Sequence, residues 1–228
     1  MTFEKQLSFC VITRNDEKYI SDCLRDMKDI ADEMIVADLG SCDRTAALAR
    51  QLGAAVYPVE WEDDFSRVMN FCMEKASGRW VLFLQPDEMM EEEQREKLRR
   101  LLDNPNAEAF LFYIAYHPEE RGISSPAQML RLFRNRKEYR FQYRSFAYIP
   151  DEILTGIADS GLQISFRDEC TARGLQSRVS LLEKEAGENP EDAYLKYLYG
   201  IELLNAGKYE ESLPHLEKAR ETVNWGYL

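Results

Sequence analysis

The chain has 228 residues, enough for one sizeable domain with a small appendage, and its 45% hydrophobic and 31% charged residues are the balance of a globular rather than a disordered protein. Its net charge of −12 disfavours nucleic acid and anionic membranes as partners, because binding to phosphate backbones needs clustered Lys and Arg. No apolar run approaches the roughly 20 residues that span a bilayer, so no transmembrane segment is expected.

The cysteines and histidines are too few and too scattered for a zinc site. The five cysteines are odd in number and show no CxxC spacing, which predicts free thiols in a reducing compartment and therefore a cytoplasmic protein. The two histidines lie far apart in the sequence, at His117 and His215.

The first half of the chain alternates between strand and helix patterns. Compact apolar runs predict strands at 7–13, 33–41, 54–59 and 80–85, and apolar residues at helical spacing predict helices at 17–29, 43–52 and 64–76. Strands alternating with helices at this rhythm are typical of βαβ units on a mainly parallel twisted sheet. The fold class that we expect is therefore α/β.

The second half of the chain is expected to contain first a helix with further strands and then a purely helical segment. A helix is expected at 91–102, followed by strands at 108–116, 129–135 and 139–149, some of them antiparallel. Three amphipathic helices then follow at 175–186, 192–206 and 209–223, joined by short turns. We therefore expect an α/β domain over residues 1–170 and an all-α segment over residues 171–228.

Polar side chains follow three of the predicted strands at their carboxyl ends. Thr13 ends the first strand and Asn15 and Asp16 follow it, Asp38 ends the second, and Asp87 with Glu88 follows the apolar run WVLFL. Open α/β sheets bind ligands at this edge. Asp87 and Glu88 could also simply cap the next helix, but the convergence of several polar groups favours a ligand.

A nucleotide at this edge would need side chains and a metal ion to hold its phosphates. The sequence contains neither GxGxxG after the first strand nor GxxxxGK[ST] anywhere. Carboxylates such as those of Asp87 and Glu88 suit Mg²⁺ or Mn²⁺, which prefer oxygen ligands and bridge to diphosphates.

Three stretches of the chain resemble family 2 glycosyltransferases, and the resemblance as a whole covers about residues 5–150. These stretches are FCVITRNDEKYISDCL, MIVADLGSCDRTAALARQLGAAVY and DDFSRVMNFCMEKASGRWVLFLQPDE. The family shows Asp-Ser-Gly-Ser-x-Asp-x-Thr after its second strand, Phe-Ser-x-x-x-Asn in a later helix and an Asp-Ala-Asp-Glu-like stretch after its fourth strand. The resemblance implies the GT-A fold and a nucleotide-diphosphate sugar as the donor.

The resemblance also implies a nucleotide pocket made by the first strands. Asp38 matches the family's contact to the nucleotide base, by resemblance uracil, and Thr13 and Asn15 lie in the loop that lines the same pocket. Asn70 matches the Asn of the helix motif, where it is either a lesser donor contact or a structural amide.

The match is incomplete at the acid motif. Asp87 matches the acid that ligates the divalent cation, Mg²⁺ or Mn²⁺, between the two phosphates, and Glu88 is expected beside the donor. The first acid of the motif is replaced by Gln85, which brings no charge but can hydrogen-bond a ribose hydroxyl or a metal-bound water. The cation is therefore expected to have one protein carboxylate fewer.

Two further departures lie on the acceptor side. The family's His-Glu pair falls at Phe146 and Ala147, neither of which can take a proton, and Arg167-Asp168-Glu169-Cys170 stands where relatives have His-x-Gly-Tyr. Inverting transfer needs a base, and Asp151 and Glu152 are the candidates to replace it.

The C-terminal segment follows the spacing of one tetratricopeptide repeat. Its signature residues are Asn189, Pro190, Gly200, Ala206, Gly207, Tyr209, Leu216 and Ala219. A solitary repeat cannot form a solenoid, so it is expected to pack on the catalytic domain or on a second subunit, which would make a homo-oligomer.

These observations support an inverting, metal-assisted transfer of sugar from a nucleotide-diphosphate sugar to an unknown acceptor (protein, peptide or glycan). The altered residues also support an alternative, a degenerate GT-A-like protein that serves as a nucleotide-sugar-binding or scaffold module. A nucleotidyltransferase is disfavoured because no Gly-rich phosphate loop or Lys pair follows the first strand.

Overall fold

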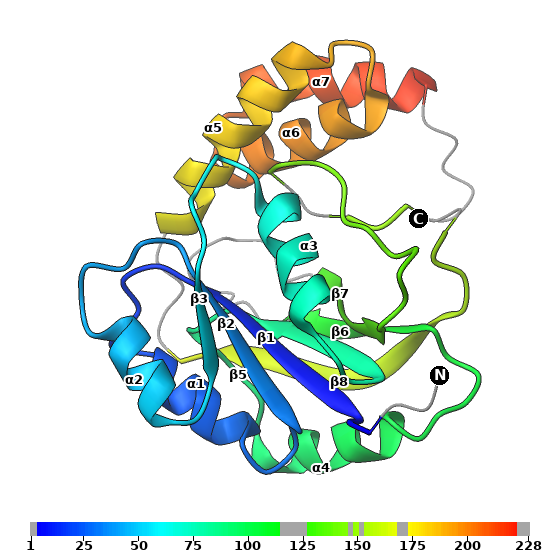
Figure 1. Cartoon of the computed structure of the whole chain (residues 1–228). Helices are drawn as coiled ribbons and strands as arrows, with labels where there is room; N and C mark the ends of the chain where they lie inside the picture. The colour runs from blue at the N-terminus through cyan, green and yellow to red at the C-terminus, as the bar shows by residue number, and fades with distance from the viewer. Residues whose placement is uncertain (1–3, 115–126, 146–147, 151–152, 168–172, 223–228) are drawn as a thin grey trace. The chain divides into compact units, whose positions relative to one another are not determined.

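The computed structural model describes residues 4–114, 127–145, 148–150, 153–167 and 173–222 (Figure 1). The chain divides into two compact units. The sheet unit comprises Met1–Glu62, Arg67–Phe141 and Ile149–Cys170, and the helical unit comprises Asp63–Ser66, Gln142–Tyr148 and Thr171–Leu228.

The sheet unit is built on a mixed β-sheet whose described strands run in the order β3-β2-β1-β4-β7-β6-β8-β5. The four strands β3, β2, β1 and β4 are parallel, and β7 pairs antiparallel with both β4 and β6. The strands are β1 (Leu7–Thr13), β2 (Glu33–Asp38), β3 (Ala55–Pro58), β4 (Trp80–Leu84), β5 (Glu88–Met89), β6 (Ala109–Ile114), β7 (Ala127–Arg134) and β8 (Ile157–Phe166).

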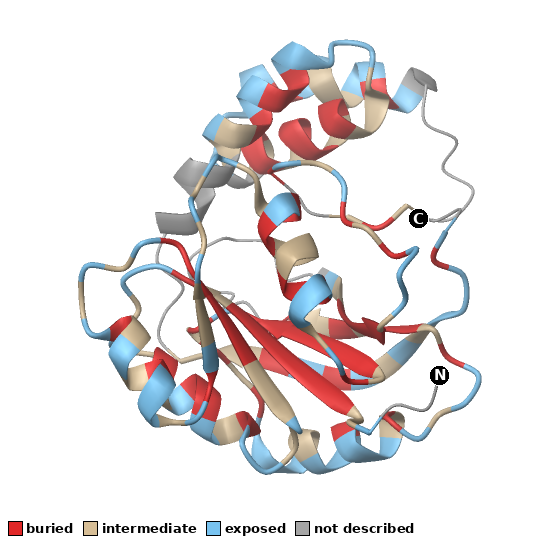
Figure 2. Ribbon diagram, viewed as in Figure 1, coloured by how far each residue is buried: buried red, intermediate tan, exposed pale blue. Residues whose placement is uncertain are grey.

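Helices cover both faces of the central strands, which explains why β4 is buried along its whole length (Figures 1 and 2). On one face Phe9 of β1 belongs to a core with Leu24 of α1 (Ile20–Met27) and Leu98 of α4 (Glu92–Leu101). On the other face Cys10 meets Cys72 of α3 (Phe65–Lys75). The helix α2 (Thr45–Gln51) connects β2 to β3.

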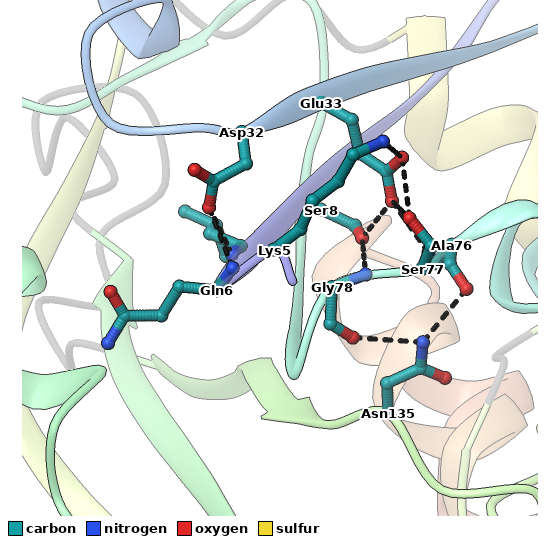
Figure 3. Close-up of polar contacts among 10 residues, drawn as sticks. Lys5, Gln6, Ser8, Asp32, Glu33, Ala76, Ser77, Gly78 and Asn135 are labelled. Carbon is teal, nitrogen blue, oxygen red and sulfur yellow. Dashed lines mark hydrogen bonds and ion pairs between the residues drawn. The ribbon is translucent and has the colours of Figure 1, made fainter. Parts of the chain in front are cut away.

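A carboxylate fastens the amino ends of the central strands (Figure 3). Glu33 of β2 accepts hydrogen bonds from Lys5 Nζ at 2.6 Å, from Ser8 Oγ of β1 at 2.5 Å and from the Ser77 backbone N–H at 2.6 Å. The Gly78 N–H in turn donates to Ser8 Oγ at 2.8 Å. A Cβ at Gly78 would lie 2.7 Å from the Ser8 backbone nitrogen, so glycine permits this close approach of the chains.

The helical unit contains α5 (Arg173–Glu188), α6 (Ala193–Asn205) and α7 (Tyr209–Thr222). Asp192 caps α6, because its Oδ1 accepts from the N–H groups of Tyr194 and Leu195. Gly200 lets α6 and α7 pack closely, since a Cβ there would lie 2.7 Å from a carbon of Leu216. No described helix, in either unit, has both the length and the apolar character needed to cross a bilayer.

The segment Gln142–Tyr148 belongs to the helical unit rather than to the sheet. Buried Glu185 of α5 holds it, accepting from the Arg144 N–H at 2.7 Å and from the Ser145 hydroxyl at 2.6 Å. The strand expected at 139–149 was therefore wrong: among the described residues of this segment only an isolated bridge joins Gln142 to Tyr148, and Tyr143 adopts a φ of 64° that extended strands exclude.

The remaining differences from the predicted elements have local causes. The structure confirms the α/β class and the parallel first half. It also confirms a strand at 129–135, which is antiparallel, and the three C-terminal helices. β8 was missed because Asp159, Ser160 and Gly161, residues typical of turns, interrupt its pattern. Gly161 has a φ of 64°, and the pairing of β6 with β8 shifts register between Leu111 and Tyr113.

Candidate active site

Three loops meet at the carboxyl edge of the parallel strands, where the sequence predicted a ligand. The ends of β1 and β2 lie side by side, since Thr13 pairs in register with Asp38 and the Leu39 N–H donates to the Thr13 carbonyl at 2.9 Å. β4 pairs with β1 on its other side, and its last residue, Leu84, leads directly into the acid motif. The parallel register thus brings the three polar segments to one edge.

Asn15 ties the first loop to the second. Its N–H donates to Ser41 Oγ at 2.9 Å, and its side-chain Oδ1 accepts from the Cys42 N–H at 2.8 Å. Its φ of 59° is left-handed, a conformation that Asn tolerates better than most residues. Asn15 is exposed, so it both shapes this edge and remains accessible to a ligand.

Thr13 and Asp38 are largely enclosed by the loops that they support. Thr13 is 2% exposed and its hydroxyl donates to Asp16 Oδ2 at 2.7 Å. Asp38 is 8% exposed, and its Oδ1 accepts from the Ser41 N–H at 3.2 Å. The structure therefore gives both residues local roles, and their contacts with a nucleotide base stay predictions.

The acid turn, which we define as Gln85–Glu88, is closed by hydrogen bonds in both directions. The Glu88 N–H donates to the Gln85 carbonyl at 3.1 Å, while the Gln85 N–H donates to Glu88 Oε2 at 2.8 Å. The other carboxylate oxygen, Glu88 Oε1, accepts from Arg131 Nη2 of β7 at 2.5 Å. Glu88 is 1% exposed and stabilises the turn, and its predicted place beside the donor stays a prediction.

Asp87, inside the same turn, has a different environment. Its backbone carbonyl accepts from the Arg167 N–H at 2.8 Å, which attaches the turn to the end of β8. Burial raises the pKa of its carboxyl, and the nearby Asp16 carboxylate raises it further, while Arg131 and Arg167 oppose the rise. The carboxylates of Asp87 and Asp16 therefore repel one another electrostatically at this edge.

This donor set fits a divalent cation only when a ligand brings further oxygens. Among the residues that the structure describes, no group of three or more His, Cys, Asp or Glu side chains is arranged to hold a metal ion alone. Mg²⁺ commonly binds through one or two carboxylates together with substrate phosphates and water. Asp87, with Asp16 near it, matches that pattern.

Asn70 and Gln85 differ in how far their side chains are already engaged. Asn70 Nδ2 donates to the Phe141 carbonyl at 3.0 Å, and the Phe141 N–H donates to Asn70 Oδ1 at 2.8 Å. Both the Nδ2 and the Oδ1 of Asn70 are therefore hydrogen-bonded within the protein, which favours a structural role for this amide over a contact with the donor. Gln85 is exposed at the start of the acid turn and remains available for its predicted donor contact.

The predicted base cannot be placed. Asp151 and Glu152 lie outside the described residues, as do Phe146 and Ala147 at the positions of the family's His-Glu pair. The catalytic role of Asp151 and Glu152 stays a prediction.

Two arginines beside the acid turn were missed by the sequence reasoning. Arg131 had a detectable signal, because it is a charged residue within the apolar run MLRLF and is 9% exposed. Arg167 had no detectable signal in the sequence, because it lies at a motif that departs from the family pattern. Arg167 also forms an ion pair with Asp26. Asp16 was placed at this edge but given no role.

The mixed sheet, with its polar loops at the carboxyl edge, is of the GT-A type. Residues 8–159 match the family model for glycosyl transferase family 2. The chain therefore belongs to glycosyl transferase family 2, and its C-terminal helices resemble tetratricopeptide repeats.

Relatives and solved structures agree with this assignment. A TPR repeat-containing protein of Synechococcus elongatus is 35% identical over 89% of this chain and 53% of its own length. The chain spans about half the length of the curated relatives that it matches.

Two solved structures share the fold. Mannosyl-3-phosphoglycerate synthase from Rubrobacter xylanophilus has a TM-score of 0.58 at 14% identity, over 82% of this chain and 75% of that one. Glucosyl-3-phosphoglycerate synthase from Mycobacterium tuberculosis has a TM-score of 0.55 at 18% identity, over 81% of each chain.

Proposed function

We propose that this protein transfers a sugar from a UDP-sugar to an acceptor, with inversion at the sugar carbon and with the help of Mg²⁺ or Mn²⁺. The observation that carries the proposal is the position of Asp87, a partly buried carboxylate with Asp16 near it at the carboxyl edge of a family 2 sheet. Support for the donor comes from the M. tuberculosis neighbour, whose structure was solved with Mn²⁺ and UDP.

On the donor side, the residues have separate tasks in this proposal. Asp38, Thr13 and Asn15 form the wall against which the uracil base binds, and the exposed Gln85 reaches the ribose or a water. Asp87 holds the cation, which supplies Lewis-acid stabilisation of the diphosphate that leaves. With the cation bound, Asp87 would help to hold the diphosphate at the edge of the sheet, while the loops would orient the rest of the donor.

The acceptor side depends on a proton acceptor, for which Asp151 and Glu152 are the candidates. An inverting transfer needs this base within hydrogen-bond reach of the acceptor hydroxyl. The acceptor is a protein, a peptide or a glycan, and the chain works in the cytoplasm in this proposal. The TPR-like helical unit is the part expected to contact a second subunit.

A second function is favoured by particular residues. Gln85 removes one charge from the cation site, and Phe146 and Ala147 cannot accept a proton where relatives have an ionisable pair. A protein of this kind would bind the nucleotide-sugar without transferring the sugar, and would act as a binding or scaffold module.

Turnover separates the two functions. Purified protein is incubated with a panel of UDP-sugars and Mn²⁺, with and without mixed peptide and glycan acceptors, and UDP release is followed. We expect release from one preferred donor, and its loss in Asp87→Asn, which keeps the size of the side chain but removes its charge. UDP binding without release from any donor would instead support the binding module. An absence of both binding and release would contradict both functions.

A further inference from the structure

The acid turn contains a buried ion pair between Glu88 and Arg131 of β7. Arg131 of β7 is 9% exposed and Glu88 is 1% exposed, and they meet at 2.5 Å. One oxygen of Glu88 binds the arginine, and the other accepts from the Gln85 N–H at 2.8 Å. A continuous chain of polar contacts therefore runs from β7 through Glu88 to the residue two positions before Asp87.

Stability alone is a weak explanation for this pair. Removing two charges from water is costly, and apolar residues of similar volume often stabilise a core equally well. The arginine adds a second cost, because its Nε–H is buried without a hydrogen-bond partner among the described residues. The pair does fix the orientation of the Glu88 carboxylate, because both of its oxygens are bound.

We infer that Arg131 is a positioning residue for Asp87, acting through Glu88. The pair fixes the backbone before Asp87, while the Arg167 N–H holds the Asp87 carbonyl itself at 2.8 Å. Arg131 also neutralises Glu88, so Asp87 is the carboxylate of the turn that remains for a cation. The part of this inference that concerns the donor rests on the proposed function.

A matched control lies on the same strand. Arg134 is 5% exposed, and like Arg131 it has one buried guanidinium nitrogen without a partner. Its other nitrogens donate to the carbonyls of Ala107 at 3.1 Å and Asn104 at 2.5 Å, and its guanidinium lies 3.9 Å from the centre of the Trp80 ring. Arg134→Met therefore removes a buried arginine from β7 without touching the acid turn.

The experiment compares Arg131→Met, Arg134→Met and the double variant Glu88→Gln/Arg131→Met with the native chain. Hydrogen exchange measures protection of the Gln85 amide, and calorimetry measures UDP affinity with Mn²⁺, at a temperature where every variant is folded. We expect Arg131→Met to speed Gln85 exchange and to weaken UDP affinity about tenfold, the usual scale for lost support of a metal ligand. Arg134→Met should lower the melting temperature without either effect.

The double variant covers the case in which Arg131→Met does not fold. Gln at position 88 keeps a carbonyl for the Gln85 N–H and leaves no unpaired buried charge, so it should fold and recover part of the protection. The inference is overturned if Arg131→Met exchanges Gln85 as slowly as Arg134→Met does, or if Arg131→Met, or the double variant in its place, keeps the UDP affinity of Arg134→Met. If the native chain binds no UDP, the proposed function fails, and the exchange of Gln85 still decides whether Arg131 holds the turn.

Discussion

Two neighbouring carboxylates in the acid turn have opposite surroundings, and this difference supports the separate roles proposed for them. Glu88 is 1% exposed, is paired with Arg131 and accepts a backbone N–H. Asp87 is only partly buried, and burial together with nearby Asp16 raises the pKa of its carboxyl. A cation placed at Asp87 would relieve that unfavourable environment, whereas Glu88 is already compensated.

The role of Asn70 can be separated from donor binding. Asn70→Ala removes two hydrogen bonds to the Phe141 backbone. We expect the free energy of unfolding to fall by about 1–3 kcal/mol, because partly buried backbone groups lose their partners. UDP affinity should stay within about twofold of the native value. Denaturation and calorimetric titration test both expectations, and a large loss of affinity at unchanged stability would show that Asn70 contacts the donor.

Glu33 makes stability depend on pH. Although burial alone would raise the pKa of its carboxyl, hydrogen bonds from Lys5, Ser8 and Ser77 lower it from 4.5 to about 2. A lowered folded-state pKa contributes stability above the unfolded value, near pH 4.5, and this contribution is lost as the pH falls through about 2. Glu33→Gln should therefore cost about 1–2 kcal/mol at pH 7 and flatten the stability profile between these two pH values.

Urea denaturation at a series of pH values measures this effect. Glu93→Gln on α4 is the control, because Glu93 is exposed and its ion pair is with Lys97 one turn away on the same helix. It should leave the profile almost unchanged. A Glu33→Gln profile parallel to the native one would mean that the network in Figure 3 does not anchor the strands.

Individual strands and helices could be predicted from the sequence where the apolar residues follow one clear spacing. β1 and β4 are largely apolar and buried because helices cover both faces, and their residues were predicted almost to the ends. β8 was hidden by the polar run Asp159–Gly161, and the segment 139–149 has a strand-like composition but is held to α5 by Glu185. These outcomes depend on contacts between distant residues, which local composition does not encode.

Some features of the candidate site could likewise be predicted from the sequence, and others could not. The positions of Thr13, Asn15, Asp38 and Asp87 follow from strand ends that the sequence marks clearly. The burial of Glu88 does not, because it depends on pairing with Arg131, 43 residues away in the chain. The double hydrogen bond of Asn70 likewise involves a residue 71 positions away.

The packing of α6 against α7 requires glycine at one position. Gly200→Ala would place a Cβ 2.7 Å from Leu216, so we expect a loss of about 1–3 kcal/mol despite the better helix propensity of Ala. Gly187→Ala in α5 is the matched control, because a Cβ there meets nothing within 4 Å and should stabilise the helix slightly. Chemical denaturation compares the two, and equal effects would contradict the close packing.

At the scale of the whole molecule, a family 2 sheet unit and a TPR-like helical unit occur in one chain. The same combination is consistent with the relative from S. elongatus, which is named for its TPR repeats. Because this chain spans about half of such relatives, the acceptor and the oligomeric state stay predictions. The donor site can be tested on the chain as it stands, since all the residues proposed to hold UDP lie in described parts of the sheet unit.

The most direct test of the central claim is a calorimetric titration of UDP into the native chain and into Asp87→Ala, each with and without Mn²⁺. We predict that Mn²⁺ strengthens UDP binding by at least about tenfold in the native chain, and that this strengthening disappears in Asp87→Ala. An Asp87→Ala protein with the same Mn²⁺-dependent affinity as the native chain would contradict the account, because the cation would then be held elsewhere.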